Sequence, residues 1–116
     1  MLIEINQKNI EVECCRGFWK NFRGLMFSRR KNILLVLPRE GRNRAAIHSF
    51  FVFFPFQAIF INSRNEVVGS KRIKPFRICF PKKPARYVLE LAQDCTEFES
   101  IFLNREKPLR VSFDLV

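Results

Sequence analysis

The chain has 116 residues, a length that fits a single domain spanning residues 1–116 with one hydrophobic core. Hydrophobic residues make up 47% of the chain and charged residues 28%, which excludes a disordered or collagen-like protein. It lacks the run of about 20 apolar residues that would cross a bilayer, and its first residues lack the basic and apolar regions of a signal peptide. We therefore expect a cytoplasmic protein whose four cysteines are reduced thiols.

The net charge of +10 comes from two segments that flank a phenylalanine-rich centre. Residues 16–44 hold nine basic groups and one acidic group, and residues 64–86 hold eight basic groups and one acidic group. Residues 45–63 between them hold no Lys, Arg, Asp or Glu. The two basic segments would attract polyanions if the fold brings them onto one face. Otherwise they form a solvated surface that keeps the protein soluble.

The N-terminal third predicts two strands, a helix and a buried strand, in that order. Apolar and polar residues alternate over residues 2–5 and 10–13, which is typical of a hairpin. Within residues 18–26 apolar side chains recur at i, i+4, i+7 and i+8, the spacing of a short helix with one apolar face. The aliphatic run at residues 33–37, closed by Pro38, predicts a strand that is buried on both faces.

The centre of the chain predicts strands on both sides of Pro55. Aromatic and β-branched residues favour a strand over residues 47–54, and Pro55 interrupts it because proline lacks the backbone donor that a continuous strand needs. Residues 57–73 then predict a hairpin, since turn-forming residues at 62–65 separate two strand-like runs. The phenylalanines of this region have no basic residues interleaved with them, so we interpret them as core.

Residues 76–80, 87–91 and 109–115 alternate between apolar and polar and predict three further strands. A capping-box pattern at residues 94–97 predicts a second short helix that starts near Cys95. The whole pattern predicts a mainly β fold, a small single-domain antiparallel β-barrel or coiled sheet with about eight strands and two short helices. Closure into a barrel would remove the exposed sheet edges.

Three blocks of the sequence occur in the order and spacing of a known family. The first is Gly-Leu-Met-Phe at residues 24–27, the second covers residues 47–50, 54–61 and 66–68, and the third is residues 87–91. Together they resemble domain-of-unknown-function family 192 over roughly residues 15–116. The resemblance implies a small, mainly β, barrel-like domain with no established activity, and it implies no catalytic residues.

Two positions depart from the pattern of that family. Gln57 stands where the family usually has an aspartate, and Ala92 with residues 93–94 stands where it usually has a glycine soon after the third block. If the aspartate serves a site, its loss weakens that site in this chain. If it only caps a turn, Gln57 is a modest structural change.

The residue types that carry chemistry favour a binding module over an enzyme. His48 is the only histidine, so a catalytic triad would have to use it. The four cysteines form no C-x-x-C pair, and no two acidic residues are spaced as a general acid and base. We expect no catalytic residues, no metal and no cofactor. An enzyme whose catalytic residues form an unrecognised arrangement remains an open alternative. A polar cluster inside a cavity would distinguish this alternative from a binding module.

The favoured interpretation is a non-catalytic module that binds a ligand or a partner. A pocket for an anionic or polar ligand is predicted where polar residues interrupt or border the apolar core, although packing in the core is the favoured role of His48 itself. The residues of this candidate ligand site are His48, Ser49, Arg72 and Lys74.

The alternative interpretation is sequence-nonspecific association with nucleic acid through a basic surface. Such binding rests on phosphate contacts and weakens steeply as the salt concentration rises. The residues of this candidate surface are Arg29, Arg30, Lys31, Arg42, Arg44, Lys82 and Lys83.

Overall fold

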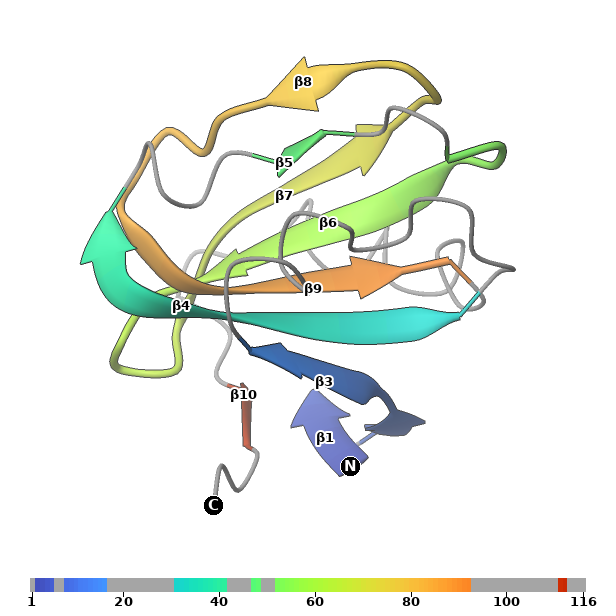
Figure 1. Cartoon of the computed structure of the whole chain (residues 1–116). Helices are drawn as coiled ribbons and strands as arrows, with labels where there is room; N and C mark the ends of the chain where they lie inside the picture. The colour runs from blue at the N-terminus through green and yellow to red at the C-terminus, as the bar shows by residue number, and fades with distance from the viewer. Residues whose placement is uncertain are drawn as a thin grey trace.

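The computed structural model of the chain describes residues 2–5, 8–16, 31–41, 47–48, 52–92 and 111–112 (Figure 1). These residues contain strands and no helix, and the two predicted helices lie outside them. The ten strands found there are β1 (Leu2–Ile5), β2 (Lys8–Glu11), β3 (Glu13–Arg16), β4 (Asn32–Gly41), β5 (Ile47–His48), β6 (Phe56–Ile61), β7 (Val67–Ile73), β8 (Ile78–Cys79), β9 (Ala85–Leu91) and β10 (Val111–Ser112).

A five-stranded sheet with the order β3-β4-β9-β6-β7 forms the centre of the molecule (Figure 1). Its neighbouring strands are antiparallel except β3 and β4, which run parallel. All six residues of β6 and the first six of β4 are buried. A strand that is apolar on both faces needs a covering layer on each side, so this sheet must be sandwiched.

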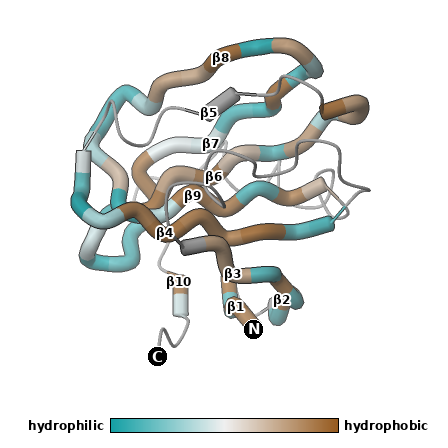
Figure 2. The backbone as a smooth tube through the Cα atoms, viewed as in Figure 1, coloured by the Kyte–Doolittle hydropathy of each residue, from teal (hydrophilic) through white to brown (hydrophobic). Residues whose placement is uncertain are grey.

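Two smaller sheets supply those covering layers. The three-stranded sheet β10-β1-β2 lies on one side of the central sheet, and the two-stranded sheet β5-β8 lies on the other (Figure 1). Figure 2 shows strongly hydrophobic stretches in the central strands β4 and β9, between these layers. The fold is thus built from stacked layers around a central sheet.

The core consists of two hydrophobic clusters, one on each face of the central sheet. We name them by the strand that covers them. The β8-side cluster contains Cys15, Ile33, Leu35, Leu37, Val52, Phe54, Phe56, Ala58, Phe60, Ile73, Cys79, Ala85, Val88 and Ala92. The β1-side cluster contains Ile3, Ile5, Ile10, Val12, Leu34, Val36, Ile59, Ile61, Leu89, Leu91 and Val111.

The prediction of a mainly β fold is confirmed, but its barrel form is wrong for the described part of the chain. Strands β3 and β7 are the two edges of the central sheet, and no described strand joins them. The strands are also not all antiparallel, because β3 pairs parallel with β4. The physical reason is that the β1–β2 hairpin packs across a face of the sheet and does not close the gap between its edges.

Several predicted strands are shorter than expected. The strand predicted at residues 10–13 is divided between β2 and β3, on either side of Val12. Residues 52–54 of the run at 47–54 are not part of a strand, and β8 keeps only two residues of the run at 76–80. Alternation of apolar and polar residues predicts an extended segment, but it does not show over how many residues that segment pairs with a neighbouring strand.

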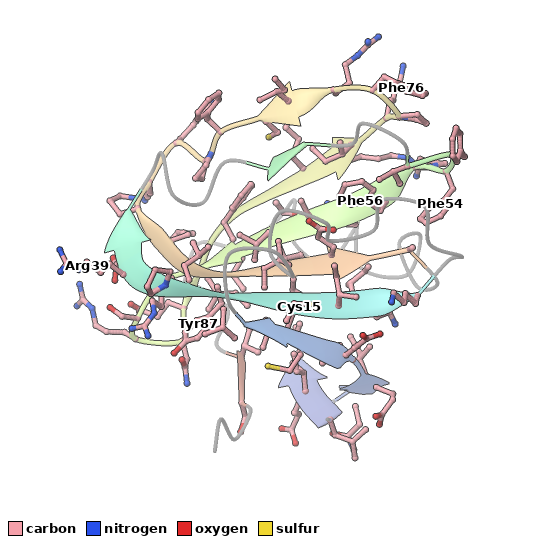
Figure 3. The ribbon with its side chains drawn as sticks, in the orientation of Figure 1. Cys15, Arg39, Phe54, Phe56, Phe76 and Tyr87 are labelled. Atoms are coloured by element: carbon pink, nitrogen blue, oxygen red, sulfur yellow. The ribbon has the colours of Figure 1, made fainter. Side chains whose placement is uncertain are left out.

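The core assignment of the central phenylalanines is confirmed for three of the four that the structure describes. Phe54, Phe56 and Phe60 are buried in the β8-side cluster. Phe53 is 66% exposed, and the assignment is wrong there. Figure 3 labels Phe54 and Phe56 near one end of the central sheet.

The predicted hairpin of residues 57–73 forms as β6 and β7, and Asn62 organises its turn. The Asn62 side-chain oxygen accepts hydrogen bonds from the backbone N–H groups of Arg64 and Glu66, each at 2.9 Å. Asn65 has a φ of 62°, in the left-handed region that asparagine tolerates. Its carbonyl accepts a bond from the Val111 N–H at 2.9 Å, which ties β10 to this turn.

Candidate functional site

The structure places the four residues of the predicted ligand site on two separate strand pairs. His48 lies in β5, opposite Ile78 of β8, and Ser49 lies outside the described residues. Arg72 lies in β7 and pairs with β6, and exposed Lys74 follows that strand. The described residues show no pairing between β5 and β7.

The Arg72 side chain also lies on the face of the central sheet that is opposite to the β5–β8 pair. Ile73 belongs to the β8-side cluster together with Cys79 of β8. Successive side chains of a strand point to opposite faces, so Arg72 points to the face away from β8. The structure therefore brings Arg72 to a different set of neighbours from those that the sequence predicted.

Those neighbours centre on Gln57, which lies directly opposite Arg72 in the β6–β7 ladder and opposite Leu91 in the β6–β9 ladder. Leu91 belongs to the β1-side cluster, so all three side chains share that face. The Gln57 side-chain amide donates a hydrogen bond to the hydroxyl of Ser70. We call Gln57, Ser70 and Arg72 the Gln57 site.

The Gln57 site combines a buried amide with an exposed cation. Gln57 is only 3% exposed, and its side-chain oxygen Oε1 is a buried acceptor that has no hydrogen-bond partner among the described residues. Ser70 and Arg72 are exposed. An unsatisfied buried acceptor costs about 1–3 kcal/mol, and each such group in a native fold calls for an explanation, such as a bound water, an ion or a functional role.

A register shift in the hairpin assembles this site. The pairing is irregular between Phe60 and Ile61, where β7 holds one residue more than β6. Without that shift Gln57 would face Lys71, and the β7 side chains beyond the bulge would change face. The sequence had singled out Gln57 and Arg72 for separate reasons, but Ser70 was missed because a bulge has no clear signature in a single sequence.

The opposite face of the sheet carries a buried acid, Glu90 of β9. Its ladder neighbours are Ile33 in β4 and Ala58 in β6, both in the β8-side cluster. Burial in this apolar surrounding raises the pKa of Glu90 to about 8. Burial is also the main cause that raises the pKa of the Cys15 thiol, with a smaller contribution from the charge of Glu13.

Glu90 is therefore mostly protonated at neutral pH, and Cys15 is a thiol and not a reactive thiolate. Within the described residues no group of three or more His, Cys, Asp or Glu side chains lies close enough to hold a metal ion. In the same part of the chain, no helix is long and apolar enough to span a membrane.

The residues predicted to bind nucleic acid are only partly described. Arg29, Arg30, Arg42 and Arg44 lie outside the described residues. Lys31 makes an ion pair with Glu13 at 2.9 Å, whereas Lys82 and Lys83 are exposed between β8 and β9. Of the described residues of this predicted surface, Lys82 and Lys83 are thus exposed, and Lys31 is paired with a carboxylate.

Solved structures support the fold as a known architecture. A protein of unknown function from Novosphingobium aromaticivorans superimposes with a TM-score of 0.80, covering 97% of this chain and 84% of that one at 15% identity. A second structure, from Sinorhizobium meliloti, also gives a TM-score of 0.80, covering 96% of this chain and 91% of that one at 16% identity. At these identities the likeness shows the fold alone.

Sequence comparison shows closer relatives. A UPF0127 protein of Pyrococcus furiosus is 43% identical over 82 residues, covering 70% of this chain and 71% of that protein. A UPF0127 protein of Thermococcus sibiricus is 45% identical over 81 residues, 68% of this chain, which span about half (53%) of that relative. The family model described as "DUF192: Uncharacterized ACR" matches residues 1–103. The resemblance seen in the sequence blocks is thereby confirmed, and the chain belongs to domain-of-unknown-function family 192.

Proposed function

We propose that this protein is a non-catalytic binding module that takes a small polar ligand with an anionic group at the Gln57 site. The single observation that carries the proposal is the buried Gln57 oxygen, which lies beside Ser70 and opposite Arg72 and finds no hydrogen-bond partner in the part of the chain that the structure describes. Ser70 and Arg72 are exposed, so a ligand can contact these two side chains from solvent. The Gln57 oxygen is buried, so the proposal requires that the ligand displace neighbouring side chains to reach it.

The chemistry of the site defines the class of ligand. The Gln57 oxygen needs a hydrogen-bond donor, and the Arg72 guanidinium favours a carboxylate or phosphate, which it can bind in a bidentate manner. A hydroxy acid or an amino acid carries both groups within a few bonds of each other. An amide, a hydroxyl and a guanidinium recognise such a molecule, but none of them is a general acid or base at neutral pH.

The experiment compares three small probes that differ by one group. Lactate carries a hydroxyl donor and a carboxylate, propionate lacks the hydroxyl, and 1,2-propanediol lacks the carboxylate. We expect lactate to raise the melting temperature of the full chain most, because ligand binding to the native state stabilises it. Calorimetric titration with lactate would then measure the affinity. Equal shifts with all three probes, or no shift with any, would contradict the proposal.

Variants test which residues hold the probe. Arg72→Gln should abolish the response to lactate, whereas Lys71→Gln should keep it, because Lys71 is the adjacent residue of β7 and points to the other face. Gln57→Leu should also abolish the response while raising stability by about 1 kcal/mol, since it removes the unsatisfied buried oxygen. His48→Ala tests the other half of the predicted ligand site. If it alone abolishes the response, the ligand lies at β5 and not at Gln57.

A further inference from the structure

A second surface, separate from the Gln57 site, gathers most of the exposed large apolar side chains of the described residues. Four of the five such side chains lie on it, and Phe76, Ile78 and Phe80 occupy one five-residue segment at 48–59% exposure. The fourth, Phe53, contacts Phe76 edge to face, with ring centroids 6.0 Å apart. Clustered exposed apolar groups on a protein domain mark a binding surface.

The backbone of this segment turns the apolar side chains outward. Cys79 of β8 packs into the β8-side cluster, so its neighbours Ile78 and Phe80 point away from the core. Phe76 has a φ of 60°, an unusual conformation for a bulky residue without glycine's freedom. Strained positions of this kind concentrate at functional sites. Figure 3 shows Phe76 at the outer edge of the molecule, next to β8.

The stretch of chain that surrounds this segment is basic. Seven basic residues and no acidic residue occur between Glu66 and Glu90. Arg77, Lys82 and Lys83 are exposed. They lie within three residues of the exposed rings of Phe76 or Phe80 along the chain. We call Phe76, Arg77, Ile78, Phe80, Lys82 and Lys83 the aromatic–basic face.

We propose that the aromatic–basic face binds single-stranded nucleic acid. Flat rings stack on unpaired bases, and the neighbouring cations contact phosphates, which is how single-strand binders work without reading the sequence. A duplex hides its bases from such rings, so the rings favour a single strand. A membrane-interface surface is enriched in Trp and Tyr, and the aromatic–basic face has neither.

The experiment measures the fluorescence anisotropy of a labelled oligothymidine of about 15 nucleotides, a length that one small domain can cover. The full chain is titrated against this probe, against the matching duplex, and against vesicles of phosphatidylcholine with phosphatidylserine. We expect the single strand to bind more tightly than the duplex, and its affinity to fall as salt rises from about 50 to 200 mM.

Two kinds of variant separate stacking from charge. Phe80→Ala should weaken binding about fivefold or more and leave the salt dependence unchanged, because one base then has no ring to stack on. The double variant Lys82→Gln with Lys83→Gln should reduce the slope of log affinity against log salt by about 0.7 for each phosphate that the two lysines neutralise in the unaltered chain.

Leu2→Ser and Arg64→Gln are the matched controls, because both side chains are exposed. Leu2 belongs to β1 and Arg64 to the turn between β6 and β7, and both of these elements lie away from β8 (Figure 1). We expect both controls to bind like the unaltered chain. Tighter binding of the duplex, binding of vesicles alone, no binding of any probe, or equal losses in the control variants would each overturn the proposal. None of these outcomes bears on the lactate response of the Gln57 site.

Discussion

At the scale of single residues, Glu90 has the most unusual environment in the described part of the chain. It sits in the middle strand of the central sheet, between Ile33 and Ala58. Glu13 of β3 and Lys71 of β7 lie level with Glu90 across the sheet, and one whole strand separates each of them from it. Taking a carboxylate out of water without a nearby opposite charge favours its protonated form, and this sets the pKa of about 8.

The raised pKa of Glu90 predicts how stability changes with pH. In the unfolded chain a glutamate releases its proton near its ordinary pKa of 4.5, whereas folded Glu90 keeps it up to about pH 8. The folded state thus binds more protons in this range, so stability is highest below the unfolded pKa and falls as pH rises toward 8. We expect Glu90 to contribute a fall of up to about 1.4 kcal/mol per pH unit, measured by urea unfolding between about pH 5 and pH 8.

Glu90→Gln should remove this fall, because the amide does not titrate, and should raise stability at pH 8 by several kcal/mol as an order of magnitude. Glu4→Gln, at an exposed carboxyl on β1, is the control and should leave the profile unchanged. If Glu90→Gln and the unaltered chain show the same pH profile, Glu90 is ionised in the folded protein and its neighbours differ from those described.

At the scale of elements, the β6–β7 hairpin positions more of the molecule than any other unit. Its register shift sets Gln57 opposite Arg72. Its turn is joined to β10 through Asn65, and to the end of β4 through Glu40, whose carboxylate accepts hydrogen bonds from the Ser63 backbone and hydroxyl. These hydrogen bonds lower the pKa of Glu40, and the charges of Arg64 and Arg86 lower it further.

Asn62→Ala tests the turn. The substitution leaves two backbone N–H groups of the turn without their acceptor, so we expect a loss of about 2 kcal/mol in the free energy of unfolding. Ser63→Ala removes only an exposed hydrogen bond to Glu40 and should cost about 0.5 kcal/mol or less. Chemical denaturation of the two variants compares them directly. Equal losses would mean that the turn does not depend on the Asn62 side chain.

At the scale of the whole molecule, the two hydrophobic clusters share one sheet. Residues of β4, β6 and β9 alternate between the β8-side cluster and the β1-side cluster, as Leu34 and Leu35 do. Because both clusters pack against the same central sheet, unfolding of that sheet would expose both of them. We expect this coupling to make the layers one cooperative unit, and the single domain over residues 1–116 stays a prediction from chain length.

We therefore expect one unfolding transition. Circular dichroism and scanning calorimetry should give the same midpoint, and the calorimetric and van't Hoff enthalpies should agree. Native-state hydrogen exchange should find the slowest amides in β9, such as that of Leu89, because β9 lies in the middle of the central sheet. A separate early transition confined to β10-β1-β2 would show that this layer folds on its own.

Much of the fold could be predicted from local patterns alone. The buried strands at residues 33–37, 57–61 and 87–91 and the hairpin turn at 62–65 all follow from side-chain type, alternation and turn residues that lie close together in the chain. The family, too, was evident from short blocks of sequence. The candidate ligand residues were predicted less well, because His48 and Arg72 come from strands that do not pair in the described part of the chain.

The sequence by itself determined where the strands at residues 33–37, 57–61 and 87–91 lie, that the first of them is apolar on both faces, and how much positive charge the chain carries. Only the tertiary structure decided that Gln57 meets Arg72, that Glu90 is buried on an apolar face, and that Phe76 and Phe80 point outward. The reason is physical. Alternation and composition act between neighbours in the chain, whereas register, layer order and burial depend on contacts between residues that are far apart in sequence.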